Sequence, residues 1–273
     1  MSPSPKPGSS ALAAERRYVV PALIALLAAL AWVSMVLWSA SPYARYFDHG
    51  GWLDAAGLHA LCEAVPEGSL VVPAVLHAGA WVLMIVAMML PTTLPLLGIF
   101  TRVTAGRARS GLLLALLVLG YLVAWGGFGL VAHAADSGIH RVAGRFDWLT
   151  SHAWVIGALI LVLAGAFQFS ALKHRCLDRC RAPAGFVSSR WSGRRPVRES
   201  FRIGLDHGLF CIGCCWALML VMFAVGMGNL GWMLALTAVM AAERNLPSGR
   251  RLAAPAGVAL LAWSAVTVVA HAA

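Results

Sequence analysis

The chain contains the stretch Gly204-Leu-Asp-His-Gly-Leu-Phe-Cys-Ile-Gly-Cys-Cys-Trp-Ala-Leu-Met-Leu-Val-Met222, which is apolar enough to lie in a bilayer and yet carries a histidine and three cysteines. If the stretch is helical, with about 100° between residues, its nitrogen and sulfur donors share one side. These donors are His207, Cys211, Cys214, Cys215, Met219 and Met222. Such soft ligands suit Cu(I) or Zn(II) and are poor ligands for calcium or magnesium. The stretch therefore predicts a soft-metal site inside an apolar helix.

An ordinary structural explanation exists for each of these residues alone. Free Cys behaves as a small hydrophobe, Met fills gaps in cores, and a single buried His is often only hydrogen-bonded to a neighbour. Three thiols and a histidine lie within nine residues here, and this density favours metal ligation over simple packing.

The composition indicates a polytopic membrane protein. The 273 residues are 60% hydrophobic and 12% charged, with a mean hydropathy of +0.78, which a soluble domain of this size does not have. We predict an all-α transmembrane helical bundle of about seven spans, each of about twenty residues. The spans are expected near residues 18–40, 72–97, 112–133, 152–172, 201–225, 229–243 and 252–270. Residues 1–17 are predicted to be a disordered N-terminal tail, and residues 18–273 a single transmembrane domain.

The distribution of basic residues predicts the orientation. Nine of the 21 Lys and Arg residues lie between Lys173 and Arg202, and only Arg45, Arg141 and Arg145 fall in connections expected outside. By the positive-inside rule the N-terminus is inside, and we expect a multi-pass protein of the bacterial cytoplasmic (inner) membrane. The net charge of +10 does not indicate nucleic-acid binding, because the basic residues are not interleaved with aromatics in one patch.

The second predicted span carries a further stripe of donors. At helical spacing His77, Met84 and Met88 share a face, with Trp81 between them. The rise of about 1.5 Å per residue places Met84 and Met88 at a depth that overlaps that of Cys211–Cys215, so the two stripes could face each other. The alternative is a helix kinked at Pro91 whose Met residues fill gaps.

Other candidate residues flank the fourth and sixth predicted spans. Cys176 and Cys180 are one helical turn apart among basic residues, which favour the thiolate form that binds metal. Gln168 is an intramembrane amide that either joins helices or orients a ligand. Glu243 is ionisable and close to the hydrocarbon, where pairing with Arg244 or Lys173 would be a sufficient structural reason for it. Most of the six cysteines lie at the expected cytoplasmic side or within the bilayer, where thiols usually stay reduced, so a disulfide framework is not expected.

Three motifs carry a resemblance to a known family. They are Ala87-Met-Met-Leu-Pro91, Lys173-His-Arg-Cys-Leu-Asp-Arg-Cys-Arg-Ala-Pro183 and Gly208-Leu-Phe-Cys-Ile-Gly-Cys-Cys-Trp-Ala-Leu-Met219. Over residues 81–251 the chain resembles a bacterial family of predicted metal-binding integral membrane proteins, a domain of unknown function whose members are sometimes labelled copper chaperones. The resemblance implies metal-binding roles for Cys176, Cys180, Cys211, Cys214 and Cys215, and it matches Glu243-Arg244 to the family's acidic-basic pair. The chain departs from the family at Gly226-Met-Gly-Asn229 and Ser170-Ala-Leu-Lys173.

These observations leave several functions open. The leading hypothesis is a protein that binds copper, with zinc as the alternative metal, and passes it to or from a periplasmic or membrane metal-donor or acceptor protein, with lipid as its surroundings. The second is a copper-dependent membrane oxidoreductase or oxygenase component. A third function is thiol-disulfide exchange, but this chain lacks a thioredoxin-like motif beside a βαβ unit. A fourth is a purely structural subunit, in which the donor stripes would serve for packing.

Overall fold

The computed structural model describes residues 8–41, 52–53, 71–226 and 228–272, and within them every regular element is a helix. The long helices are α1 (Gly8–Ser39), α3 (Val71–Met88), α5 (Ser110–Ala143), α7 (Trp154–Phe167), α10 (Pro196–Val225), α11 (Leu230–Asn245) and α12 (Ala253–Ala272). The shorter elements are η2 (Pro91–Thr93), α4 (Leu94–Val103), α6 (Asp147–Ser151), α8 (Ala171–Arg181), α9 (Pro183–Ser188) and η3 (Gly249–Leu252). The predicted all-helical class is confirmed.

Among the residues that the structure describes, between four and six segments are long and apolar enough to cross a membrane. Four are single helices, over residues 18–39, 110–143, 196–225 and 249–271. Two more are bent pairs, α3 with η2 and α4 at 47°, and α7 with α8 at 63°. Helix α11 has 16 residues and is therefore about 24 Å long, shorter than the hydrocarbon core of about 30 Å. The predicted span at 229–243 is thus not among these candidates, and the described part of the chain does not confirm the predicted number of seven spans.

The bend after α3 follows from the two prolines in the motif that ends it. Pro91 and Pro95 have no backbone N–H to donate, so the helix cannot continue its regular hydrogen bonds there. The carbonyls of Met89 and Leu90 stay paired in the turn, because each accepts both the backbone N–H, at 3.2 and 3.0 Å, and the hydroxyl, at 2.7 Å, of Thr92 and Thr93 respectively. The chain therefore changes direction without leaving these buried carbonyls unsatisfied.

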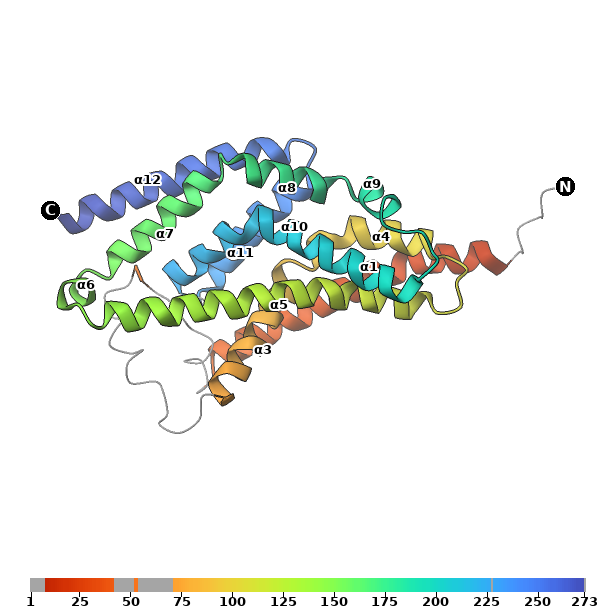
Figure 1. Ribbon diagram of the computed structural model, residues 1–273, viewed down its shortest axis with the longest axis horizontal. Coiled ribbons are helices and arrows are strands. Elements are labelled where there is room, and N and C mark those ends of the chain that lie inside the picture. The colour runs from red at the N-terminus through yellow and green to blue at the C-terminus, as the bar shows by residue number, and fades with distance from the viewer. Residues whose placement is uncertain (1–7, 42–51, 54–70, 227, 273) are drawn as a thin grey trace.

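Helix α10 lies at the centre of the bundle (Figure 1), where it packs against α5, α7, α8 and α11. Small residues allow the close approach of α5 and α10: a Cβ at Gly204 would collide with the Leu117 carbonyl, and one at Gly120 with the Phe201 carbonyl. Such positions are typical of membrane helix interfaces. Further along α5, Gly129 leaves room for the ring of Trp81, whereas Gly126 and Gly127 face open space.

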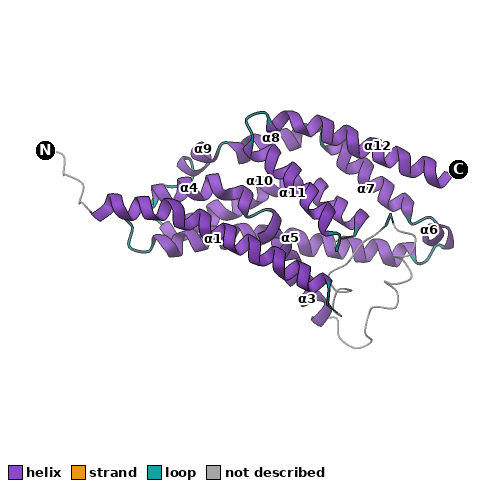
Figure 2. Ribbon diagram, turned by 180° about the vertical axis from the view of Figure 1, so that it is seen from behind, coloured by secondary structure: helices purple, strands orange, loops and turns teal. Residues whose placement is uncertain are grey.

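The remaining helices flank this centre on two sides. Helix α1 packs along α3 and α4, and α7 pairs with α12 on the other flank (Figure 2). Helix α1 begins at Gly8, inside the segment 1–17 for which a disordered tail is predicted, while residues 1–7 lie outside the described residues. The division into a tail and a single domain stays a prediction.

Candidate metal centre

The three cysteines of α10 are buried side by side in the core. Cys211, Cys214 and Cys215 are at most 1% exposed. The Cys214 and Cys215 sulfurs lie 3.3 Å apart, and the Cys214 thiol donates to the Cys211 carbonyl at 3.1 Å. The spacing i, i+3, i+4 thus places three thiols on one helix face, as the sequence indicates.

Helix α8 adds two more thiols to this region. Cys180 is a hydrogen-bonding partner of Cys214. The Cys176 sulfur packs closely against Gly213 of α10, where an added Cβ would lie only 2.6 Å from it. The five cysteines of the described residues are all free. The structure therefore brings together cysteines that are 31 to 39 positions apart in the chain, on the two adjacent helices α8 and α10.

Arg244, near the end of α11, inserts its guanidinium among these groups. Its Nη1 donates to the Cys211 sulfur at 3.1 Å and to the Thr92 hydroxyl, and its Nη2 lies 3.2 Å from His207 Nε2. A guanidinium can only donate, so Nε2 of His207 accepts and the imidazole proton is on Nδ1. The side chain thus joins α10, α11 and η2 around one thiol.

Tyr121 of α5 completes the surroundings of Cys211. Its hydroxyl lies 3.2 Å from the Cys211 sulfur, and the residue is only 1% exposed. Cys211 therefore contacts a phenol, a guanidinium and the neighbouring thiols at once. The guanidinium of Arg244 always donates, and the Tyr121 hydroxyl is able to donate, so this environment suits negative charge on sulfur.

A pocket of about 190 Å³ connects this cluster with the surface. Its lining includes Thr92, Cys180, Arg181, His207 and Arg244. His207 and Arg244 belong to the same hydrogen-bonded group as Cys211, so the pocket reaches the outer layer of the thiol cluster. It is large enough for an ion or a few water molecules.

Glu243 has a different role from its neighbour Arg244. Its carboxylate accepts from the Lys173 ammonium at 2.7 Å, and both side chains are at most 1% exposed. The Arg181 guanidinium donates to the Glu243 and Pro247 carbonyls. Of the two partners that the sequence suggests for Glu243, the structure has Lys173, and the pair joins α8 to α11 as a buried crosslink.

The donors of α3 lie apart from the described polar contacts of the thiols. His77 stacks on His133 of α5, with ring centroids 3.9 Å apart and the planes at 28°. Met84 and Met88 are fully buried within the large apolar core that also contains the cysteines. Helix α3 packs mainly on α1 and α5, and it meets α10 where the Trp81 ring lies 6.1 Å from Phe223.

The other predicted supporting residues lie in helix contacts. The Gln168 amide donates to the Ala164 carbonyl of its own helix α7 at 3.1 Å, and its Cβ packs against Gly257 of α12, so its predicted role as a polar link between helices stays a prediction. Met219 and Met222 are fully buried on α10. Sequence reasoning missed Tyr121, Thr92 and the role of Arg244. An arginine in an apolar helix is a signal for such a role, but we considered Arg244 only as the partner of Glu243.

Within the described residues, no group of three or more His, Cys, Asp or Glu side chains is arranged to hold a metal ion. The hydrogen bonds explain this. Two sulfurs at about 2.3 Å from a tetrahedral ion are about 3.8 Å apart, whereas the Cys214 and Cys215 sulfurs are at hydrogen-bonding distance, 3.3 Å. Arg244 also holds the donor atoms of Cys211 and His207. The cluster has the donor types of a soft-metal site in a hydrogen-bonded arrangement.

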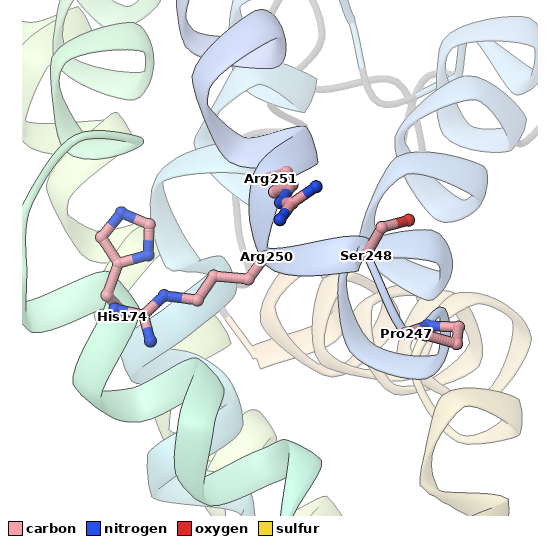
Figure 3. A pocket seen from close by; sticks show the side chains of 5 residues that line it. All are labelled: His174, Pro247, Ser248, Arg250 and Arg251. Carbon is pink, nitrogen blue, oxygen red and sulfur yellow. The ribbon is translucent and has the colours of Figure 1, made fainter.

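Two basic pockets lie elsewhere on the molecule. One has a volume of about 600 Å³ and is lined by His174, Pro247, Ser248, Arg250 and Arg251; Figure 3 shows that the Arg250 side chain extends toward His174. The other has a volume of about 580 Å³ and lies around the first turns of α10.

A comparison with protein families shows which family the chain resembles. The family model PpoB2, described as copper chaperone, matches residues 78–267, which is more than half of the chain. No curated protein sequence and no solved structure matches the chain.

Proposed function

Because the chain belongs to the PpoB2 family of copper chaperones, we propose that it binds copper through the thiols of Cys211, Cys214 and Cys215 inside the membrane and passes it to another protein. The family label and the apolar helices together indicate a copper-related membrane protein. The observation that supports the ligand assignment is the contact of Arg244 with Cys211, at 3.1 Å in a fully buried place.

The charge of a thiolate cluster supports this assignment. A deprotonated thiol in an apolar interior is costly unless a cation neutralises it. Arg244 supplies one permanent positive charge beside Cys211, and a Cu(I) ion supplies a second. Thiolates select Cu(I) over hard cations, and zinc is the alternative ion for the same sulfurs.

The other donors have graded roles in this proposal. Cys180 is the fourth thiol, because it bonds to Cys214 and also lines the pocket of about 190 Å³. His207 lines the same pocket and contacts Arg244, so it is the first nitrogen that an entering ion meets. Cys176 is a reserve ligand on α8. We assign His77, Met84 and Met88 to a separate group of donors along α3. Met219 and Met222 of α10 have a supporting role.

The proposal includes a topology. We infer an N-terminus inside, a bacterial inner membrane, and a seventh crossing completed by the short helix α11. The pocket of about 190 Å³ then faces the arginine-rich cytoplasmic side, since Arg181 lines it. A metal-donor or acceptor protein on that side, or in the membrane, would exchange the ion through it.

Elemental analysis of the detergent-purified chain tests the proposal. We expect co-purified copper in the wild type and its loss in the triple variant Cys211→Ser/Cys214→Ser/Cys215→Ser. Circular dichroism checks that the variant keeps its helices. Measurement of zinc in the same samples identifies the ion. A wild type that carries neither ion, when prepared without chelator from copper-supplemented cells, contradicts the proposal.

A further inference from the structure

The pocket of about 580 Å³ at the start of α10 combines six charged side chains. Four are arginines, Arg190, Arg195, Arg198 and Arg202, and two are acidic, Glu199 and Asp206. The pocket lies at the N-terminal end of α10, before the segment that carries Cys211, Cys214 and Cys215. A charge of this pocket is available to a ligand only if no other group of the protein already pairs with it.

Both carboxylates are already engaged within the protein. Glu199 accepts from the backbone N–H groups of Ser192, Gly193 and Arg195 at 2.7–3.0 Å and from the Ser192 hydroxyl at 2.6 Å. It therefore holds the loop before α10 in place. Asp206 accepts from Nε of Arg190 at 2.8 Å. These contacts leave the negative charges directed at the protein itself.

Three guanidinium groups of the pocket have no such partner. Within the described residues, no hydrogen bond or ion pair engages the side chains of Arg195, Arg198 and Arg202, and all three residues are exposed. Arg198 and Arg202 are one turn apart on α10 and differ by about 40° in direction, and Arg195 is the N-cap residue directly before the helix. The three arginines therefore place three positive charges around the first turns of α10.

An apolar surface continues this face toward the middle of the helix. Leu209 lies between the directions of Arg198 and Arg202 on the helical wheel and about 10 Å beyond Arg202. Its side chain is 56% exposed. Guanidinium groups followed by an exposed aliphatic side chain match the phosphate and the acyl chain of a phospholipid. A free phosphate ion would use only the first of these two features.

We propose that Arg195, Arg198 and Arg202 form a binding site for the phosphate of an anionic phospholipid, whose acyl chain lies along Leu209. Guanidinium groups bind phosphate oxygens in a bidentate manner, and basic pockets between membrane helices on the cytoplasmic side bind anionic head groups. The pocket in Figure 3 is less suited, since Arg250 is paired with Asp178 at 3.1 Å.

The test measures lipid affinity of the full chain in detergent. Native mass spectrometry is used to titrate phosphatidylglycerol and phosphatidylcholine onto the wild type and the variant Arg198→Gln/Arg202→Gln. Each arginine is expected to contribute about fivefold, so the variant should bind phosphatidylglycerol about 25-fold more weakly, with phosphatidylcholine unchanged.

The matched control is Arg175→Gln/Arg179→Gln, which removes two exposed arginines with the same spacing from α8. It should change the affinity for phosphatidylglycerol by less than about twofold. An equal loss in both variants means that general surface charge attracts the lipid, and this overturns the site. Competition experiments identify the ligand class. If inorganic phosphate or an acidic peptide displaces phosphatidylglycerol as effectively as a second anionic lipid does, the assignment to a lipid is overturned.

Discussion

The guanidinium of Arg244 lies 3.1 Å from the sulfur of Cys211, although the two residues are 33 positions apart. Through this contact and its bond to Thr92, one side chain of α11 joins the thiol helix to the bend between α3 and α4.

Replacement of Arg244 tests its contribution to both stability and copper binding. Arg244→Gln removes a buried positive charge and leaves Cys211 and His207 without their donor, so we expect a loss of about 3–5 kcal/mol in the free energy of unfolding. Copper content should fall with it, because no fixed charge then balances the thiolates. Thermal unfolding and elemental analysis of purified protein give the two values. Arg250→Gln, which changes an exposed arginine, should leave both unchanged.

The buried pair Lys173 and Glu243 should behave as a coupled unit. Glu243→Gln leaves the ammonium unpaired in the core and should cost about 3–5 kcal/mol, whereas the double replacement Lys173→Met/Glu243→Leu should be less harmful than either single change. A double-mutant cycle on thermal unfolding measures the coupling. Additive effects would mean that the pair does not join α8 to α11 energetically.

The close approach of α5 and α10 predicts different effects of one substitution at different glycines. Gly204→Ala places a methyl group against the Leu117 carbonyl and should destabilise the protein by about 1–3 kcal/mol. Gly126→Ala adds the same group to a helix position in open space and should be neutral or stabilising by up to about 1 kcal/mol. The midpoints of thermal unfolding compare the two. Equal effects would contradict the packing of these helices.

Alkylation should distinguish the thiols by their access to the pocket. Cys180 lines the pocket and is 8% exposed, whereas Cys215 is 1% exposed. A small maleimide should therefore label Cys180 at least about tenfold faster, as a rate measured by peptide mass spectrometry. Added Cu(I) should slow the labelling of Cys180 if that thiol is a ligand.

The two histidines among the predicted ligands should differ in their effect on copper. His207 lines the pocket and contacts Arg244, while His77 stacks on His133 away from the thiol contacts. We expect His207→Ala to lower the copper content more than His77→Ala. The reverse order, measured on equally folded proteins, would assign the main site to the α3 donor group.

The sequence was most informative where a property repeats locally. The apolar runs predicted an all-helical membrane protein, the prolines after Met89 predicted a break, and the i, i+4 spacing placed Cys176 and Cys180 on one face of a helix. The resemblance drawn from three motifs is confirmed by the family match. The span at 229–243 stays a prediction, because α11, with 16 residues, is not among the helices long enough to qualify as a membrane span by length.

The composition of the site was harder to predict, because its contacts join distant parts of the chain. Nothing in the local pattern shows that Tyr121 lies beside Cys211, or that Arg244 faces Thr92 rather than pairing with Glu243. These contacts depend on how α5, α11 and the bend pack around α10. Periodicity predicts the face of a helix on which a residue lies, but it does not identify the residue on the helix opposite.

The threonine-lined bend between α3 and α4 has a mechanical consequence. Thr92 is part of the bend and also an anchor of Arg244, so any change in the 47° angle between the two segments shifts the anchor. The position of the bend and the position of the guanidinium beside Cys211 are therefore not independent, because both depend on the side chain of Thr92.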